Sequence, residues 1–186
     1  MPIAADRETR KPTKPTPGTP PALSGSWLVD PQASHARFVA GTLAGLMKTP
    51  GRFRSLSGHL VVDQDQVAGA LVVDSSSIDT GNRMRDRHLR SRAFFDVKRH
   101  PQVRYEAHSI SSQDPGRARI HGELIVADIR TPLPVDVTLH TPTDGVVELA
   151  CHTEVDRVAL GIRGVRGMMP RAVQLDVAIT LRQAIA

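Results

Sequence analysis

The chain contains very few of the residues that reinforce small folds. Its 186 residues include one cysteine, Cys151, one tryptophan, Trp27, and one tyrosine, Tyr105. A single cysteine excludes an intramolecular disulfide and a cysteine-rich zinc site, which are the usual staples of small secreted domains. Because aromatic residues make up only 3% of the chain, the core must be built mainly from Val, Leu, Ile and Ala.

Long apolar runs are also absent. A secretory signal peptide needs about 7–15 consecutive apolar residues and a membrane-spanning helix about 20. Residues 1–22 are rich in Pro, Thr, Lys and Arg and contain no apolar run, so we expect a disordered tail there. The sequence therefore predicts a cytoplasmic protein without a membrane span, made of this tail and one folded domain over residues 23–186.

Signatures of catalysis and of metal binding are missing as well. The eight histidines are scattered singly, without the His-x-His or His-Glu-x-x-His spacing of a metal site. The sequence contains no Gly-x-Ser-x-Gly elbow, and Cys151 falls on the apolar face of a predicted strand, where burial makes a thiol unreactive. Residues 161–167 are glycine-rich but lack the spacing of a phosphate loop. We therefore expect no enzyme, no cofactor and no metal.

Alternation of apolar and polar residues, the pattern of a half-buried strand, recurs along the chain. The clearest case is 173–181, in which five apolar residues alternate with four polar or small ones. The other segments with this pattern are 36–40, 53–62, 70–74, 103–107, 120–126, 133–139 and 147–155. About eight strands, each with one polar face, predict an all-β fold, either an antiparallel barrel or a sandwich.

Residues 82–99 interrupt this alternation. Met84, His88 and Leu89 recur there at helical spacing, and Pro101 marks the return to extended chain. The same segment is strongly basic, and its excess of five positive charges equals the formal net charge of the whole chain, +5. Its basic residues are Arg83, Arg85, Arg87, Arg90, Arg92, Lys98 and Arg99, against Asp86 and Asp96. The sequence predicts a short, basic helical insertion.

The same region carries motifs of a known family. They are Ser76-Ser77-Ile78-Asp79-Thr80-Gly81, Arg85-Asp86-Arg87-His88-Leu89-Arg90-Ser91 and Ala93-Phe94-Phe95-Asp96-Val97-Lys98-Arg99-His100-Pro101, preceded by Trp27…Asp30…Ser34…Phe38 and by Gly51-Arg52-Phe53…Gly58. With these motifs, residues 27–183 resemble the YceI-like family of polyisoprenoid-binding proteins. The resemblance implies an extended eight-stranded antiparallel lipocalin-like barrel with a short helical insertion, and it makes a homodimer plausible.

The predicted inward faces carry many small residues, namely Ala36, Ala40, Ala107, Ser109, Gly122, Cys151 and Thr153. An eight-stranded barrel is either filled by its side chains or has room for one ligand, and small residues fit both a cavity and two closely packed walls. The resemblance favours a cavity that holds an isoprenoid-type or other long-chain lipid. The predicted ligand-binding residues are Trp27, Phe38, Phe53, Val103, Tyr105, Leu124, Val137 and Leu149.

The basic segment 83–99 has two interpretations. Arg87, Arg90 and Arg92 are head-group candidates that could surround the phosphate of a prenyl ligand. Alternatively, the segment is a solvated helical face with a structural pair between Arg85 and Asp86. Nucleic acid is not expected as a partner, because the segment has no interleaved aromatic residues and no known nucleic-acid motif.

Two functions remain open from the sequence. The first is non-enzymatic binding, transport or sequestration of an isoprenoid-type lipid, either polyprenyl or quinone-like, in an apolar barrel cavity. The second is an interaction module with a packed core whose segment 83–99 binds an anionic partner. Thr42 and Ala159-Leu160 depart from the family pattern, so fatty acids and amide-type lipids remain possible ligands as well.

Overall fold

The computed structural model describes residues 23–42, 47–63, 66–162 and 170–184. The tail predicted for residues 1–22 lies outside the described residues. The described strands are β1 (Gly25–Val29), β2 (His35–Thr42), β3 (Met47–Phe53), β4 (Leu56–Asp63), β5 (Gln66–Asp74), β6 (Ile78–Asp79), β7 (Gln102–Asp114), β8 (Arg117–Val126), β9 (Ile129–Pro132), β10 (Val135–Thr143), β11 (Val146–Asp156) and β12 (Ala172–Gln183). The helix α1 (Arg83–Arg90) and the short 3-10 helix η3 (Ser75–Ser77) lie between β5 and β7.

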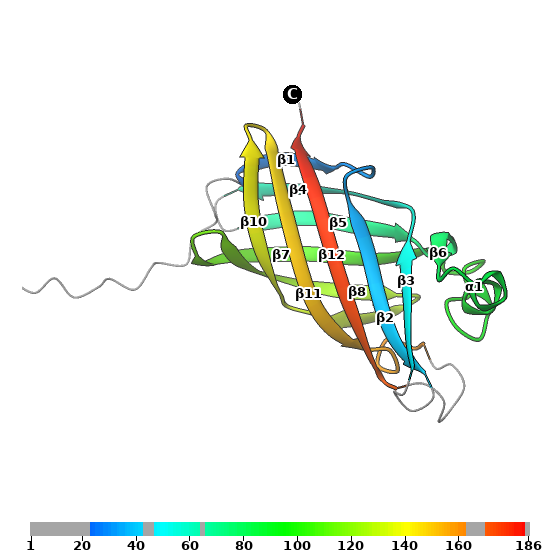
Figure 1. Cartoon of the computed structure of the whole chain (residues 1–186). Coiled ribbons are helices and arrows are strands. Elements are labelled where there is room, and N and C mark those ends of the chain that lie inside the picture. The colour runs from blue at the N-terminus through cyan, green and yellow to red at the C-terminus, as the bar shows by residue number, and fades with distance from the viewer. Residues whose placement is uncertain (1–22, 43–46, 64–65, 163–169, 185–186) are drawn as a thin grey trace, which may run out of the picture.

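The strands close into an antiparallel barrel (Figure 1). Around the barrel the order is β1, β4, β5, β7, β8, β10, β11 and β12, and β12 pairs again with β1. The strand β2 continues β1 along β12, and β3, paired with β2, continues β4. β1 and β2 therefore act as one long, interrupted strand, and β3 and β4 act as another. The predicted eight-stranded antiparallel barrel is confirmed.

The break between β1 and β2 is shaped by a side-chain turn at Asp30. Its carboxylate accepts hydrogen bonds from the backbone N–H groups of Gln32, at 3.0 Å, and Ala33, at 3.2 Å. Such a turn replaces the strand ladder locally. Arg182 on the neighbouring β12 donates to the same carboxylate at 2.7 Å. This ion pair fixes the bend against the barrel wall.

One end of the barrel is filled by a packed core. Leu23, Ala118 and Val147 are fully buried there, and Trp27 is 4% exposed. The indole N–H of Trp27 donates to the Leu23 carbonyl at 2.9 Å. We call this the closed end of the barrel.

The opposite end carries the helical insertion (Figure 1). Asn82 caps α1, because its side chain accepts hydrogen bonds from the N–H groups of Met84 and Arg85. Residues 91–99 follow as turns, so the predicted helical insertion in 82–99 is confirmed. We refer to residues 82–99 as the cap. The cap end of the barrel is the end formed by the cap, the start of β3, the β8–β9 turn and the β11–β12 connection.

The alternation fails at one predicted inward residue, Ser109. The pairing of β7 with β8 shifts register between Ala107 and Ser109, and such a bulge moves the following residues to the other face. Ile110, which is 3% exposed, therefore takes the interior position expected for Ser109. Gly122 is buried as expected, but the ring of Tyr105 covers it.

Candidate functional site

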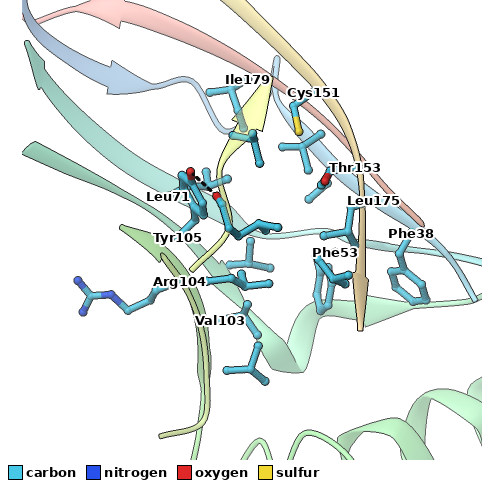
Figure 2. A pocket seen from close by; sticks show the side chains of 18 of the residues that line it. Phe38, Phe53, Leu71, Val103, Arg104, Tyr105, Cys151, Thr153, Leu175 and Ile179 are labelled. Carbon is cyan, nitrogen blue, oxygen red and sulfur yellow. Dashed lines mark hydrogen bonds between the residues drawn. The ribbon is translucent and has the colours of Figure 1, made fainter. Parts of the chain in front are cut away.

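The barrel encloses a cavity of about 280 Å³ between the closed end and the cap (Figure 2). Its walls consist almost entirely of carbon. Ligand cavities in proteins span roughly 300–1,000 Å³, so the volume of this one falls just below that range. The interior is therefore not filled by its own side chains.

Seven of the eight residues predicted to bind ligand line this cavity. They are Phe38, Phe53, Val103, Tyr105, Leu124, Val137 and Leu149. Trp27 is the exception, because it lies in the closed end, where Leu23 covers it. The structure thus brings seven of these side chains around one space. That they contact a ligand stays a prediction.

The cap supplies lining residues that the sequence analysis missed. Leu89, Phe94 and Phe95 all face the cavity. The ring centroids of Phe53 and Phe95 are 6.0 Å apart, with the rings edge to face, a favourable arrangement for an aromatic pair. Periodicity could not assign these residues, because the chain leaves its strand pattern in the cap. The available signals were the helical spacing of Leu89 with Met84 and His88 and the adjacent apolar pair Phe94-Phe95 in a basic segment.

A glycine shapes the wall beside this aromatic pair. Gly51 on β3 is the register partner of Phe38 on β2, and the Phe38 ring lies directly over it. A Cβ added to Gly51 would overlap the ring of Phe38. The ring centroids of Phe38 and Phe53 are 5.7 Å apart. Without a side chain at Gly51, Phe38 lies back against the wall and leaves the lumen open.

Few polar groups reach the cavity. The Tyr105 hydroxyl donates to the Leu133 carbonyl at 3.0 Å (Figure 2), and burial raises the pKa of Tyr105. Arg104 contributes only its apolar stem, since its guanidinium points away from the cavity and pairs with Glu106 at 3.2 Å. The other lining residues with polar side chains are Arg37, His59, Cys151, Thr153 and Arg157, and Figure 2 shows the thiol of Cys151 and the hydroxyl of Thr153.

Cys151 lies on the inward face of β11, as predicted. Burial, with smaller contributions from the charges of Asp176 and Asp136, raises the pKa of its thiol to about 11. The thiol is therefore neutral at ordinary pH and behaves as a small apolar group. This supports its assignment to the wall of an apolar cavity.

Arg157 was not singled out from the sequence, yet it organises the β11–β12 connection. It is 5% exposed, and its guanidinium donates to the carbonyls of Pro170 and Ile162, both at 2.8 Å. Beside it, Arg171 binds the carboxylate of Asp156 at 2.6 Å. These contacts join the two sides of the connection next to the cavity lining of Leu160 and Ile162.

The three head-group candidates have different environments. Arg90 donates to the carbonyls of Ser76, at 2.7 Å, and Ile78, at 2.6 Å, so its guanidinium holds the cap to the barrel. Arg87 is exposed and lines, together with Arg90, a charged hollow on the outside of the cap. Arg92 is exposed as well and lies outside this hollow.

Arg85 and Asp86 do not form the expected pair, because both bind Thr80. The Asp86 carboxylate accepts hydrogen bonds from the Thr80 N–H, at 2.9 Å, and from its hydroxyl, at 2.6 Å. Arg85 donates to the same hydroxyl and to the Thr80 carbonyl. The N–H, hydroxyl and carbonyl groups of Thr80 therefore bind Arg85 and Asp86 in place of a direct pair between these two residues. The two residues lock the start of the cap.

Asp79 anchors the cap region to β3. The Gly81 N–H and the guanidinium groups of Arg54 and Arg52 lower the pKa of this carboxyl group to about 2. Arg54 approaches it at 2.8 Å and Arg52 at 3.0 Å. The charge of Asp79 is thus neutralised locally, and it does not offset the basic surface of the cap.

Two absences hold for the part of the chain that the structure describes. No group of three or more His, Cys, Asp or Glu side chains there could hold a metal ion. None of its helices has the length and apolar character needed to cross a bilayer.

The closed antiparallel barrel, its carbon-lined cavity and the short helical cap define a lipocalin-like barrel. Comparison with known sequences is consistent with this class, because the profile of the YceI-like domain matches residues 27–182. The chain belongs to the YceI-like family.

Individual relatives agree with this assignment. A UPF0312 protein of Vibrio parahaemolyticus is 25% identical over 120 residues, which are 62% of this chain and 63% of the relative. A UPF0312 protein of Ectopseudomonas mendocina is 28% identical over 119 residues, 61% of this chain and 62% of that protein. The matches therefore span less than two thirds of these relatives.

Solved structures show the same fold. BcnA of Burkholderia cenocepacia has a TM-score of 0.74 at 19% identity and covers 82% of this chain and 98% of its own. A polyisoprenoid binding domain from Saccharophagus degradans has a TM-score of 0.72 at 13% identity, covering 85% and 98%. At these identities the likeness establishes the barrel architecture.

Proposed function

We propose that this protein is a non-enzymatic carrier that binds, transports or sequesters an isoprenoid-type lipid, polyprenyl or quinone-like, in its barrel cavity. The observation that carries the proposal is the carbon-lined cavity of about 280 Å³. The Saccharophagus neighbour, described as a polyisoprenoid binding domain, supports the same class of ligand. The alternative function required a packed interior, which does not fit this cavity.

Burial of hydrocarbon would supply the affinity. Each CH₂ group moved from water into an apolar site contributes about 0.8 kcal/mol, so roughly fifteen buried carbons contribute about 12 kcal/mol. Association costs about 4–15 kcal/mol, so a chain of this size contributes enough to offset most or all of that cost. The small volume favours a short prenyl chain, or the terminal part of a longer one, inside the barrel.

The closed end determines the orientation of the ligand. Because the core around Trp27 fills that end, the hydrocarbon would enter from the cap end and leave its head group there. Arg87 and Arg92 are the proposed contacts for a phosphate head group, since both are exposed on the cap and a guanidinium fork suits phosphate. Arg90 is not included, because the carbonyls of Ser76 and Ile78 already engage its guanidinium.

Organic extraction of the purified protein, followed by mass spectrometry, tests this function. We expect a prenyl or other long-chain lipid in the extract, or uptake of an added prenol by the delipidated protein. The Ala107→Phe variant, which places a ring in the cavity, serves as the matched control and should carry much less lipid. Absence of any lipid from the extract, together with no uptake of added prenol, would reject the carrier function.

A further inference from the structure

The large apolar side chains that stay exposed gather at the cap end of the barrel. Among the described residues, six large hydrophobic side chains are markedly exposed, and four of them lie on elements of this end. They are Met47 at the start of β3, Met84 on α1, Ile129 after the β8–β9 turn and Val158 in the β11–β12 connection. Figure 1 shows α1 on the same side of the barrel as β3.

Met84 is the most exposed of these residues, with 83% of its surface accessible. Of the three residues at helical spacing, Met84, His88 and Leu89, only Leu89 lines the cavity. A long apolar side chain at the tip of a helix has no packing role in this barrel. It is suited to insert into another apolar phase.

The same end is basic. Seven basic and two acidic residues lie between positions 83 and 99, and Asp86, one of the two acidic residues, is buried against Thr80. Two nearby acidic groups have basic partners of their own, since Asp79 binds Arg54 and Asp156 binds Arg171, whereas Asp128 in the β8–β9 turn is exposed. The exposed cap therefore presents a net positive surface around Met84.

We infer that the cap end docks on the surface of an anionic lipid bilayer, with Met84 inserted among the lipids and the surrounding basic residues against the lipid phosphates. Exposed apolar side chains surrounded by Lys and Arg bind membrane interfaces in two ways, by burial of their apolar surface and by attraction of the basic groups to anionic lipids. The proposed function places the entrance for the lipid at this same end, so docking would bring the cavity to the membrane from which a lipid is drawn. Only the purpose of docking, which is to bring the cavity to a lipid, rests on the proposed function; the contact between the cap end and the membrane does not.

The test is sedimentation of the full-length protein with vesicles of equimolar phosphatidylglycerol and phosphatidylcholine, and with vesicles of phosphatidylcholine alone. No prenyl lipid is present, so the assay is independent of cavity binding. We expect binding to the anionic vesicles that weakens in high salt, and little binding to the neutral ones. Equal binding to both vesicles, or to neither, would overturn the inference.

Two cap variants locate the contact. Arg83, Lys98 and Arg99 changed together to Gln should lower the partition coefficient by roughly 100-fold, because each basic residue near an anionic surface contributes about a factor of five. Met84→Asp should also reduce binding, since it replaces the inserting side chain by a charge. Both variants should keep the circular dichroism spectrum of the native protein.

A charge-matched control separates the cap from the basic N-terminal segment. Arg7, Arg10 and Lys11 changed together to Gln remove three positive charges, as the cap variant does, and this variant should still bind the anionic vesicles. Loss of binding in this variant, with retention in both cap variants, would assign the contact to the N-terminal segment and overturn the inference. Uptake of farnesol from solution, measured separately, reports failure of the carrier function by itself.

Discussion

An aromatic ring placed at Ala107 is the most informative perturbation of the barrel. It should raise the free energy of unfolding if Ala107 faces a cavity and lower it if Ala107 lies in a packed core. Ala107 is 8% exposed and lines the cavity. Its register partners on the two neighbouring strands are Gly69 and Gly122. Side chains already cover these glycines, since an added Cβ would meet Leu60 at 2.9 Å or Tyr105 at 2.7 Å. Ala107 is therefore the position in this row from which a new side chain can enter the lumen.

Ala107→Phe should raise the free energy of unfolding of the ligand-free protein. Full burial of a Phe side chain contributes about 1.5–3 kcal/mol, and part of this is lost to imperfect packing, so we expect a gain of about 1 kcal/mol. For a domain of this size that corresponds to a rise in Tm of about 2–4 °C. The assay is thermal unfolding followed by circular dichroism, with urea unfolding as a second measure.

Ala118→Phe is the matched control. Ala118 is fully buried in the packed core and does not line the cavity. The same ring should therefore overpack it and cost about 1–3 kcal/mol. If Ala107→Phe lowered the Tm as much as Ala118→Phe does, the interior at Ala107 would be packed, and the reasoning from the cavity would be refuted.

Three further predictions concern the walls and the cap. The rate of alkylation of Cys151 should keep rising with pH until the pH approaches about 11. The thiolate fraction of Cys151 at neutral pH should be about 100-fold below that of a thiol with a pKa of 9. Intact mass spectrometry measures the alkylation rate, and a plateau of this rate near pH 9 would contradict the burial of the thiol. Gly51→Ala should push Phe38 into the lumen and weaken farnesol binding in a fluorescence competition assay, whereas unchanged affinity would show that this wall does not shape the site. Changing Arg87 and Arg92 together to Gln should weaken a prenyl phosphate far more than the matching prenol, by roughly 1.5–3 kcal/mol for each lost charged hydrogen bond; equal losses for both ligands would assign these arginines to solubility.

Local alternation was sufficient to predict the regular strands of the barrel. The segments 133–139, 147–155 and 173–181 correspond to β10, β11 and β12, whose inward residues line the cavity. This works because a period of two follows directly from the geometry of a strand with one buried face. The small residues on these faces did not by themselves distinguish a cavity from a sandwich.

Interrupted strands were harder to predict. The segment 53–62 was treated as one strand, but β3 ends at Phe53 and β4 begins at Leu56. The rest of β3 was not predicted, because Pro50 and Gly51 break the pattern of β-forming residues. Proline is confined to strand positions that lack a ladder partner on one side, and at Pro50 the strand β3 pairs with β2 alone.

The site was predictable where it lies on regular strands and not where it depends on tertiary contacts. Phe38 and Tyr105 were placed by alternation, whereas Phe95 reaches the cavity only because the cap folds back against Phe53. Trp27 shows the opposite error. It points into the barrel as predicted, but it lies in the closed end, beyond the cavity. The depth of an inward residue along the barrel is not encoded in the periodicity of its strand.

The central claim is that the cavity takes up one lipid chain. Native mass spectrometry of the delipidated protein titrated with farnesol, with Ala107→Phe measured beside it, tests this claim most directly. We expect a saturable complex with one farnesol per protein chain for the native sequence and a strongly reduced complex for the variant. No complex with the native protein, or equal uptake by both proteins, would contradict it.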